Sequence, residues 1–298
     1  MDKYIEKAAV LIEALPYIQS FRDSLVVVKF GGSVMEDSEL TKQALKDIVF
    51  MECIGIKPII VHGGGKAITS KLKELNIATK FINGLRYTCS KTINVVDDIL
   101  HNNINTNLVN TINDFAGKAV SLSGKKILKA EKMFTYDKIT NEKLNLGYVG
   151  KITDVNIKKI LDITNKNIIP VITPLALDEN NQTYNINADI AAAVITKKLE
   201  ARKLVFISDV PGILKNANDE NSVISSIKLC DIDKLIQNNI ITGGMIPKVN
   251  SAAEALHAGT NKVHFIDGRL RHSLLLEIFT DSGVGTQILK EYSNLNIK

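Results

Sequence analysis

The chain has 298 residues, of which 45% are hydrophobic and 23% are charged, and it carries a net charge of +5. This length and composition suit one large or two modest α/β domains with a hydrophobic core. Nucleic-acid binding is poorly supported because the basic residues are scattered and tryptophan is absent, and no apolar run approaches the ~20 residues that a membrane span needs.

The N-terminal segment, residues 1–22, predicts an amphipathic helix. Its apolar residues recur at spacings of four and three and form a narrow stripe: Tyr4, Ala8, Leu11, Leu15 and Ile18. Pro16 is expected to kink this helix or to end its first part. The stripe either packs on its own domain or contacts a neighbouring subunit, and the sequence leaves both alternatives open.

Two segments share one order of residues, in which an apolar strand runs into a glycine turn. Residues 25–28 are aliphatic and precede Lys29 and a Gly-Gly pair, which predicts a buried parallel strand. Residues 59–66 repeat this order with three glycines, after which a helix begins. Because ligands bind at the carboxyl edge of a parallel sheet, we expect the two turns to lie side by side there, with amides available to an anion.

The middle of the chain alternates between predicted helices and strands. We expect helix 40–54, strand 57–61, a hairpin with an Asn-Gly turn at 81–88, helix 92–113, a β-hairpin insertion at 119–149, helix 155–163 and strand 168–173. Arg86 follows the hairpin turn and is either a solvated surface residue or a clamp for a carboxylate. Residues 184–189 open an alanine-rich helix, 190–199, and their polar side chains either cap it or point into a site.

The last third of the chain contains two more turns of functional interest. Strand 203–208 ends in an Asp-Val-Pro-Gly turn whose composition suits contacts with a nucleotide, and the glycine turn at 241–244 leads into a helix that reaches about His257. Lys248 lies in the first turns of that helix, where a cation opposes the helix dipole and needs an anionic partner. Strand 262–266, helix 273–279 and a closing strand, 283–289, complete the pattern.

Two common phosphate-binding motifs are absent. Gly65-Lys66 is followed by Ala67, which departs from the Walker sequence, and Ile68 stands where the dinucleotide fingerprint needs a third glycine. The sequence also contains no nucleophile elbow and no metal-binding histidine pair.

Six segments, in this order, resemble the motifs of the amino-acid kinase family, within its branch that acts on N-acetyl-L-glutamate. They are Val-Lys-Phe-Gly-Gly from residue 28, Val-His-Gly-Gly-Gly from 61, Asn-Gly-Leu-Arg from 83, Asn-Ile-Asn-Ala-Asp from 185, Ser-Asp-Val-Pro-Gly-Ile-Leu from 208 and Thr-Gly-Gly-Met-Ile-Pro-Lys from 242. The match extends from Val26 to Ile288; Phe30 and Tyr87 depart from residues common in the family, and neither is a residue with a chemical role.

The resemblance implies a fold and a domain division. The fold is an open, mainly parallel sheet between helices, in two lobes with an extra N-terminal helix. Residues 1–24 would form an oligomerisation helix, 25–200 the lobe for the amino-acid substrate, and 201–298 the lobe for nucleotide binding and regulation by arginine.

The resemblance also implies an activity: ATP-dependent phosphorylation of the γ-carboxylate of N-acetyl-L-glutamate, which gives an acyl phosphate and ADP in arginine biosynthesis. A carboxylate with a pKa of about 4.3 is already ionised at neutral pH, so the reaction needs no general base. The task that remains is to neutralise charge on the transferred phosphoryl group. Mg²⁺ would arrive with ATP, held mostly by phosphates and water, and no metal ligands are assigned to the chain itself.

The resemblance assigns residues to each part of this reaction. Lys29 and Lys248 would stabilise the transition state, and Asp189 would pair with both lysines. Backbone amides would bind the phosphoryl group at Gly31, Gly32 and Gly63. The amino-acid substrate would contact Gly64, Gly65, Arg86, which clamps its α-carboxylate, and Asn185. The nucleotide would contact Ser208, Asp209, Gly212, Thr242, Gly243 and Gly244.

Three further positions resemble the arginine-inhibited, hexameric members of the family. His264, Glu277 and Gly283 match positions implicated in arginine binding, with polar residues on a helix surface as the alternative explanation. In those members the N-terminal helix links dimers, so a homo-oligomer is expected, at least a dimer and in that branch a hexamer. Some relatives also bind a PII-type nitrogen signal protein, which nothing in this sequence decides.

Three rival functions stay open. One is a kinase for another small acid, such as glutamate, aspartate or carbamate, against which Arg86 and Asn185 argue. Another is a catalytically inactive arginine sensor, against which the intact Lys29, Asp189 and Lys248 argue, and the third is a nucleic-acid binder.

The location of the protein follows from weaker indications. The three cysteines are far apart, which predicts unpaired thiols in a reducing compartment, and acidic residues near the N-terminus argue against a secretory leader. We therefore expect a cytoplasmic protein. The abundance of Ile, Asn and Lys is a weak indication of an AT-rich genome, and the plastid stroma is expected if that genome is a plastid one.

Overall fold

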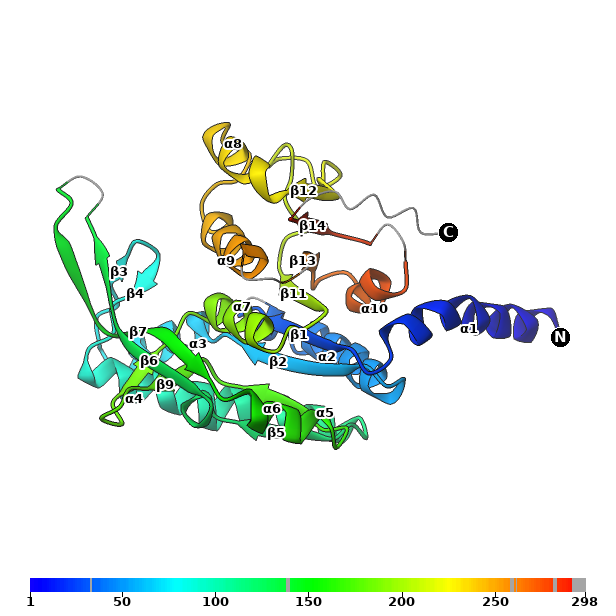
Figure 1. Ribbon diagram of the computed structural model, residues 1–298, viewed down its shortest axis with the longest axis horizontal. Coiled ribbons are helices and arrows are strands. Elements are labelled where there is room, and N and C mark those ends of the chain that lie inside the picture. Colours follow the sequence, from blue (N-terminus) through cyan, green and yellow to red (C-terminus); the bar gives the residue numbers. More distant parts are fainter. Residues whose placement is uncertain (33, 138–139, 258–259, 261, 281–282, 291–298) are drawn as a thin grey trace.

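The structure is a computed structural model that describes residues 1–32, 34–137, 140–257, 260, 262–280 and 283–290. An eight-stranded sheet runs through the molecule in the order β12-β14-β13-β11-β1-β2-β8-β5 (Figure 1). All of its neighbouring strands are parallel except β13 and β14, so the predicted open, mainly parallel sheet is confirmed. Its strands are β1 (Leu25–Phe30), β2 (Lys57–His62), β5 (Ala119–Leu122), β8 (Ile169–Ile172), β11 (Lys203–Ser208), β12 (Ser226–Lys228), β13 (Lys262–Asp267) and β14 (Thr286–Leu289).

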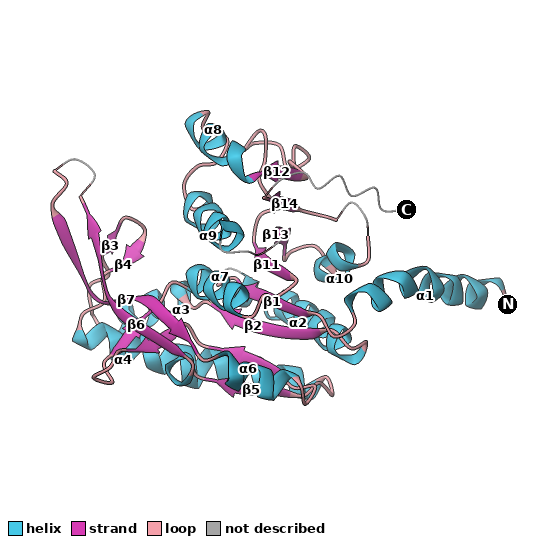
Figure 2. Ribbon diagram, viewed as in Figure 1, coloured by secondary structure: helices cyan, strands magenta, loops and turns pink. Residues whose placement is uncertain are grey.

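Helices cover both faces of this sheet, because its central strands are apolar on both sides (Figure 2). In β1, Val27 faces one buried cluster and Val26 and Val28 face the other. The first cluster includes α6 (Ile157–Thr164), α7 (Ala188–Lys198), α8 (Ile232–Gln237) and α9 (Met245–His257). The second includes α2 (Ser38–Cys53), α3 (Gly65–Glu74), α4 (Ser90–Asp98), η2 (Ile99–Asn105), α5 (Thr106–Asp114) and α10 (Ser273–Ile278). Short 3₁₀ turns are η1 (Val34–Glu36), η3 (Gly124–Lys126) and η4 (Leu229–Asp231).

A second, smaller β unit lies beside the main sheet. It consists of β6 (Leu128–Tyr136), β7 (Lys143–Val155), β9 (Leu175–Leu177) and β10 (Thr183–Asn185), which close on one another. The predicted insertion at 119–149 is therefore correct for the β6–β7 hairpin but wrong for its first strand. β5 pairs instead with β8 and forms the edge of the main sheet, with Ser121 opposite Val171 and Leu122 opposite Ile172.

The predicted hairpin with an Asn-Gly turn is confirmed as β3 (Phe81–Ile82) and β4 (Leu85–Arg86). Asn83 and Gly84 both have positive φ values, 50° and 79°, as a type I′ turn requires. The Asn83 amide donates to the Thr135 hydroxyl and the Tyr136 carbonyl, both at 2.9 Å, so this turn is attached to the long β6–β7 hairpin.

The predicted helix 92–113 is interrupted by a π-helix. Residues of α4 and α5 wind as α-helix, whereas η2 between them has the wider winding in which hydrogen bonds join residues five apart. The hydroxyl of Thr106 donates to the carbonyl of His101 at 3.2 Å, which satisfies one of the groups that the change in winding leaves free. Apolar spacing alone did not reveal this interruption.

The N-terminal helix α1 (Asp2–Phe21) runs through Pro16, so the alternative in which Pro16 ends the first part of the helix is wrong, and the alternative of a kink stays a prediction. In Figure 1 its first turns extend away from the rest of the molecule. Tyr4 and Leu11 of the apolar stripe are 72% and 66% exposed, whereas Phe21 is buried and Tyr17 packs edge-on against Phe279 of the α10 region. The last turns of α1 therefore pack on their own chain.

Among the helices of the described ranges, none is both long and apolar enough to cross a membrane. The three cysteines, all of which are described, are unpaired, as predicted.

Candidate active site

The two glycine turns leave the sheet next to each other, as predicted. β1 and β2 are parallel neighbours, with Phe30 opposite His62 in register. A methyl group placed on Gly32 would lie 3.7 Å from the amide nitrogen of Gly65, so the turns are in contact. Gly65 is the first residue of α3, whose first amides have no partner within the helix and carry partial positive charge.

Two of the three amides expected to bind the phosphoryl group are already engaged. Gly31 donates to the carbonyl of Ile207, and Gly63 donates to the carbonyl of Phe30, both at 3.1 Å. A methyl group on Gly31 would lie 2.6 Å from that Ile207 oxygen, so this glycine permits close packing of β1 on β11. Among the glycines that line the cavity beside the turns, Gly32, Gly64 and Gly65 therefore stay candidates for binding an anion through their amides.

This cavity has a volume of about 220 Å³ and brings together most of the residues predicted to bind substrate or to act in catalysis. It lies between the glycine turns, the β3–β4 hairpin and the start of α7. Its lining includes Lys29, Gly32, Gly63, Gly64, Gly65, Phe81, Arg86, Asn185 and Asp189.

Residues 185–189 fulfil both of the roles that the sequence left open. Asn187 is the N-cap of α7, and its side-chain oxygen accepts hydrogen bonds from the amides of Asp189 and Ile190 at 2.8 and 3.2 Å. Asn185 and Asp189 instead line the cavity, and Asp189 Oδ1 lies 2.7 Å from Lys29 Nζ. The cap fixes the first turn of α7 and so holds the Asp189 carboxylate opposite β1.

Lys248 completes a cluster of three charges. It is the fourth residue of α9, a helix that packs against α7, and its charge interacts with both Lys29 and Asp189. Burial alone would raise the pKa of Asp189, but the charges of Lys29 and Lys248 hold it below its ordinary value. Burial and the neighbouring Lys29 charge lower the pKa of Lys248. The carboxylate is therefore ionised and lies within the field of both lysines.

Arg86 is held in place through one nitrogen of its guanidinium group, Nη2, while the other, Nη1, has no partner among the described residues. Its Nη2 donates to the carbonyl of Gly65 and to the hydroxyl of Thr69, both at 2.8 Å, and its guanidinium lies 4.8 Å from the ring centre of Phe81. Its Nη1 is buried and has no hydrogen-bond partner within the described part of the chain. A buried, unpaired donor on a fixed cation is suited to an anionic group of a ligand in the cavity.

Thr88 links Arg86 to Asn185, a connection that the sequence analysis missed. The fully buried Thr88 hydroxyl donates to the Arg86 carbonyl at 2.9 Å and accepts from the Asn185 amide at 3.3 Å. Thr88 follows the Asn-Gly-Leu-Arg motif by two residues, and its position there was the only available signal.

The residues expected to bind the nucleotide occupy two neighbouring turns. Ser208 ends β11 and is buried, and its hydroxyl has no partner among the described residues. Asp209 is exposed, and its charge interacts with Lys66 and Lys248. Thr242, Gly243 and Gly244 are exposed just before α9, with open space around both glycines.

Gly212 does not face this region. Its φ is +149°, and a methyl group there would lie 2.6 Å from the hydroxyl oxygen of Thr286 on β14. The same hydroxyl accepts from the Ile213 amide at 2.8 Å. Gly212 thus shapes the turn by close packing, and the prediction that it contacts the nucleotide gains no support from its position.

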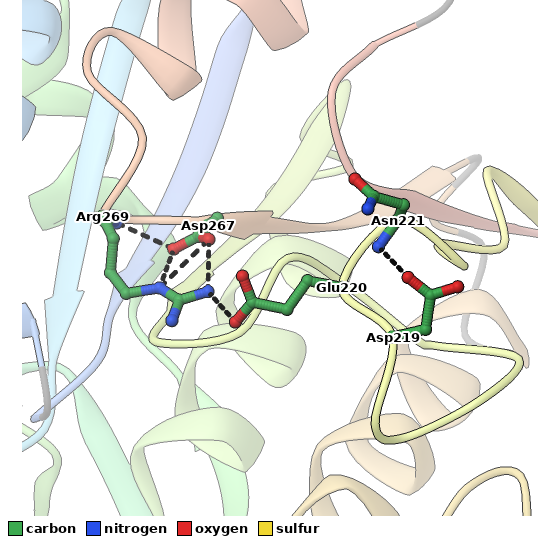
Figure 3. Close-up of polar contacts among 5 residues, drawn as sticks. All are labelled: Asp219, Glu220, Asn221, Asp267 and Arg269. Carbon is green, nitrogen blue, oxygen red and sulfur yellow. Dashed lines mark hydrogen bonds and ion pairs between the residues drawn. The ribbon is translucent and has the colours of Figure 1, made fainter.

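An arginine at the same edge of the sheet was also missed. Asp267 ends β13 opposite Ser208, and Arg269 binds it through Nε and Nη2 at 2.9–3.1 Å (Figure 3). Arg269 Nη2 also donates to Glu220 at 3.0 Å, and the neighbouring Asp219 carboxylate accepts from the backbone N–H of Asn221. These contacts fix the loop that follows β11 beside the edge where the nucleotide is expected.

His264, Glu277 and Gly283 come together at the other end of the molecule. His264 Nδ1 lies 2.5 Å from Glu277 Oε1, and the Val284 amide donates to Glu277 Oε2 at 3.1 Å. A methyl group on Gly283 would lie 2.6 Å from Glu277 Oε2, and its φ is +63°. All three residues line a cavity of about 600 Å³ that is also lined by the last turns of α1.

Lys203 belongs to this second cavity, although the sequence analysis did not select it. Its Nζ lies 3.7 Å from Glu277 Oε1. Burial lowers the pKa of Lys203 to about 8 and also lowers that of His264. Burial would raise the pKa of Glu277, but the contact with His264 and the charge of Lys203 bring it below its ordinary value. An ionised carboxylate thus lies at the wall of a large cavity.

The sequence is that of an amino acid kinase. Residues 24–267 match the amino acid kinase family, and the chain therefore belongs to that family. It is 48% identical over 296 residues to the acetylglutamate kinase of Petrotoga mobilis, covering 98% of this chain and 97% of that one. It is 43% identical over 292 residues to the acetylglutamate kinase of Akkermansia muciniphila, covering 98% of both chains. The resemblance drawn from the six motifs is confirmed.

Solved structures show the same fold. An N-acetylglutamate synthase from Neisseria gonorrhoeae, complexed with coenzyme A and N-acetyl-glutamate, matches with a TM-score of 0.83 at 23% identity over 96% of this chain, which spans only 64% of that longer protein. Carbamate kinase from Giardia lamblia bound to AMP-PNP matches with a TM-score of 0.64 at 16% identity, covering 90% of this chain and 99% of that one.

Proposed function

We propose that the protein transfers the γ-phosphoryl group of ATP to the γ-carboxylate of N-acetyl-L-glutamate. The observation that carries this proposal is the cluster of Lys29, Asp189 and Lys248 beside a cavity that also contains the unpaired Nη1 of Arg86. The near full-length similarity to acetylglutamate kinases supports the choice of substrate.

The residues fit a reaction between two anions. A carboxylate oxygen of the substrate attacks the γ-phosphorus, an O–P bond forms, and the bond to the β-phosphate oxygen of ATP breaks, giving an acyl phosphate and ADP. Lys29 and Lys248 neutralise charge on the transferred group, and Asp189 holds Lys29 in position. Amides at the start of α3 are suited to the phosphoryl or substrate oxygens.

Arg86 would hold the end of the substrate that carries the α-carboxylate, away from the reacting γ-carboxylate. The free Nη1 would bind the α-carboxylate, and Asn185, positioned through Thr88, would donate to a neighbouring polar group. The nucleotide would lie across Ser208, Asp209 and the turn before α9. Mg²⁺ bound to the ATP phosphates would add charge neutralisation; in the part of the chain that is described, no three His, Cys, Asp or Glu residues are grouped as a metal site.

The decisive experiment measures ADP release with N-acetyl-L-glutamate, L-glutamate, L-aspartate and carbamate as acceptors. We expect turnover with the acetylated substrate only, because a site built to bind an acylamino group discriminates against substrates that leave its polar groups unpaired. Equal turnover with L-glutamate would move the proposal to another small-acid kinase, and no turnover with any acceptor would refute the kinase function.

We further propose that arginine inhibits the enzyme by binding in the cavity between α1 and α10. The Glu277 carboxylate, flanked by His264 and Gly283, is the group suited to the guanidinium. Glu277→Gln is expected to abolish inhibition by arginine and to leave turnover intact, because this cavity lies apart from Lys29. Unchanged inhibition in this variant would refute the assignment.

The exposed stripe of α1 supports a role in assembly. Tyr4 and Leu11 are exposed apolar residues, and the first turns of α1 that carry Tyr4 extend away from the rest of the molecule (Figure 1). We propose that α1 joins dimers into a hexamer. Removal of residues 1–22 is expected to leave a dimer by light scattering, and a hexamer that persists would mean that the stripe is not an interface.

A further inference from the structure

A buried histidine lies directly beneath the second glycine turn. His62 is the last residue of β2, is completely buried, and precedes Gly63. Its Nδ1 lies 3.0 Å from the Gly63 carbonyl, and its Nε2 lies 3.0 Å from Nδ2 of Asn105. The turn that His62 contacts lines the cavity.

These contacts define one arrangement of protons. The Gly63 carbonyl can only accept, so Nδ1 of His62 carries the hydrogen, and Nε2 then accepts from the Asn105 amide. The second hydrogen of that amide is donated to the Val171 carbonyl at 2.8 Å. Burial lowers the pKa of His62 to about 4, so the imidazole stays neutral and this arrangement persists at physiological pH. Asn105 thus joins β2 to β8 at the edge of the sheet where the cavity lies.

The π-helix explains why Asn105 can reach His62. Leu100 and Ile104 pack on Gly64, where a methyl group would lie 2.7 and 2.8 Å from their terminal carbons. In an α-helix, five residues make about 1.4 turns, so Asn105 would lie on a different face from Leu100. Hydrogen bonding between residues five apart returns Asn105 to the face of Leu100. One turn of helix therefore supports the glycine turn with two apolar contacts and one polar contact.

We propose that His62 and Asn105 are positioning residues that set the orientation of the second glycine turn and thereby aim the amides of Gly64 and Gly65 at the reacting group. They touch no reacting atoms themselves. This inference rests on the proposed kinase function, because it gives those amides a role in phosphoryl transfer. The π-helix is the element that places Asn105 against His62, beneath the glycine turn.

The test compares three variants in the full-length chain. His62→Leu removes both hydrogen bonds, His62→Asn keeps a donor near the Gly63 carbonyl, and Asn105→Leu removes the contact from the other side. Because misplacement by about 1 Å can cost 10²-fold in rate, we expect kcat to fall about 100-fold in the two leucine variants, with KM for ATP unchanged. His62→Asn should recover at least half of that loss on a logarithmic scale.

Ile112→Ala is the matched control, since Ile112 is fully buried in α5 and packs against Gly117. It should lower the melting temperature and leave kcat within about twofold of wild type. If the leucine variants lose no more activity than this control at equal stability, or if His62→Asn is as poor as His62→Leu, the inference is wrong.

Hydrogen–deuterium exchange of residues 60–70 separates this inference from the proposed function. Faster exchange in His62→Leu and Asn105→Leu than in Ile112→Ala is expected whether or not the wild type turns over. An inactive wild-type protein would refute the kinase function, whereas an active one whose leucine variants keep both their kcat and their exchange rates would refute only the role of these two residues.

Discussion

Lys29 Nζ and Asp189 Oδ1 are 2.7 Å apart, and their side chains are only 8% and 12% exposed. The pair joins the first strand of the sheet to the first turn of α7, and Lys248 adds a second positive charge to the same carboxylate. Two cations and one anion leave a net positive charge at the site, which suits a ligand that carries phosphates.

Replacing Asp189 tests how this cluster works. Asp189→Asn leaves the buried Lys29 without its counter-charge and Lys248 with only the exposed Asp209, so we expect kcat to fall by about 10²-fold or more and the protein to lose about 3 kcal/mol of stability. Turnover assays and urea unfolding measure the two effects. The double variant Lys29→Met/Asp189→Asn should be more stable than Asp189→Asn alone, and equal stability would mean that the charges are not coupled.

Lys248 should set the alkaline limit of activity. Its pKa is lowered by burial and by Lys29, and the lysine acts only when protonated, so activity should be lost as the pH rises through that lowered value. Lys248→Ala should reduce kcat by about 10²-fold or more. Lys248→Arg, whose charge persists to high pH, should retain some activity and lose the alkaline decline. An identical pH profile in wild type and Lys248→Arg would contradict this assignment.

Arg86 should control affinity for the acceptor substrate. Arg86→Met removes a charged hydrogen bond worth about 1.5–3 kcal/mol, so KM for N-acetyl-L-glutamate should rise about 10- to 100-fold while KM for ATP stays the same. Thr88→Val should have a smaller effect of the same kind, and Thr88→Ser, which keeps the hydroxyl between Arg86 and Asn185, should have almost none. A selective defect in ATP binding would mean that Arg86 contacts the nucleotide and not the acceptor substrate.

Adjacent glycines should respond differently to alanine. Gly64→Ala places a methyl group against Leu100 and Ile104, so it should destabilise the protein by about 1–3 kcal/mol. Gly65→Ala meets no atom within 4 Å and lies at the first position of α3, so it should leave stability unchanged or raise it by about 0.5–1 kcal/mol. Its methyl group enters the cavity, so kcat/KM should still fall. Full activity in Gly65→Ala would show that ligands do not approach this turn.

Lys203 should make the stability of the folded protein depend on pH in the alkaline range. Its pKa of about 8 in the folded protein is below the 10.5 of a free lysine, so the unfolded chain binds more protons between these values. The contribution of Lys203 to stability should therefore rise with pH over this window, by at most about 3 kcal/mol. Comparing the unfolding of wild type and Lys203→Met at pH 7.5 and 10 measures it, and parallel pH curves would contradict the shift. Glu277 is ionised throughout this range and does not contribute.

The sequence predicted the parts of the site that short motifs encode. Lys29 and the glycine turns lie at the carboxyl ends of β1 and β2, which the parallel order of the strands brings to one edge of the main sheet. Arg86 instead ends a strand of the separate β3–β4 hairpin, and Lys248 lies in the first turns of α9. Local patterns sufficed because each of these residues lies close to the end of a helix or strand that its own motif predicts.

Contacts between residues far apart in the chain could not be predicted in this way. Thr88 and Asn185 meet because both pair with β7, and His62 meets Asn105 because the π-helix brings that residue to it. The sequence specifies neither arrangement. The π-helix escaped detection because apolar residues at Ile99, Leu100, Ile104, Leu108 and Ile112 also fit an α-helical face. The engaged amides of Gly31 and Gly63 depend likewise on how closely neighbouring strands approach.

The pairing of β1 with β11 constrains how ligands can enter. Five consecutive positions, from Val26 with Lys203 to Phe30 with Ile207, join the strand that carries Lys29 to the strand that precedes the nucleotide turn. No swivel between two separately folded halves can occur without breaking this ladder. A widening of the site that keeps this ladder intact therefore requires a change in the twist of the sheet that both halves share.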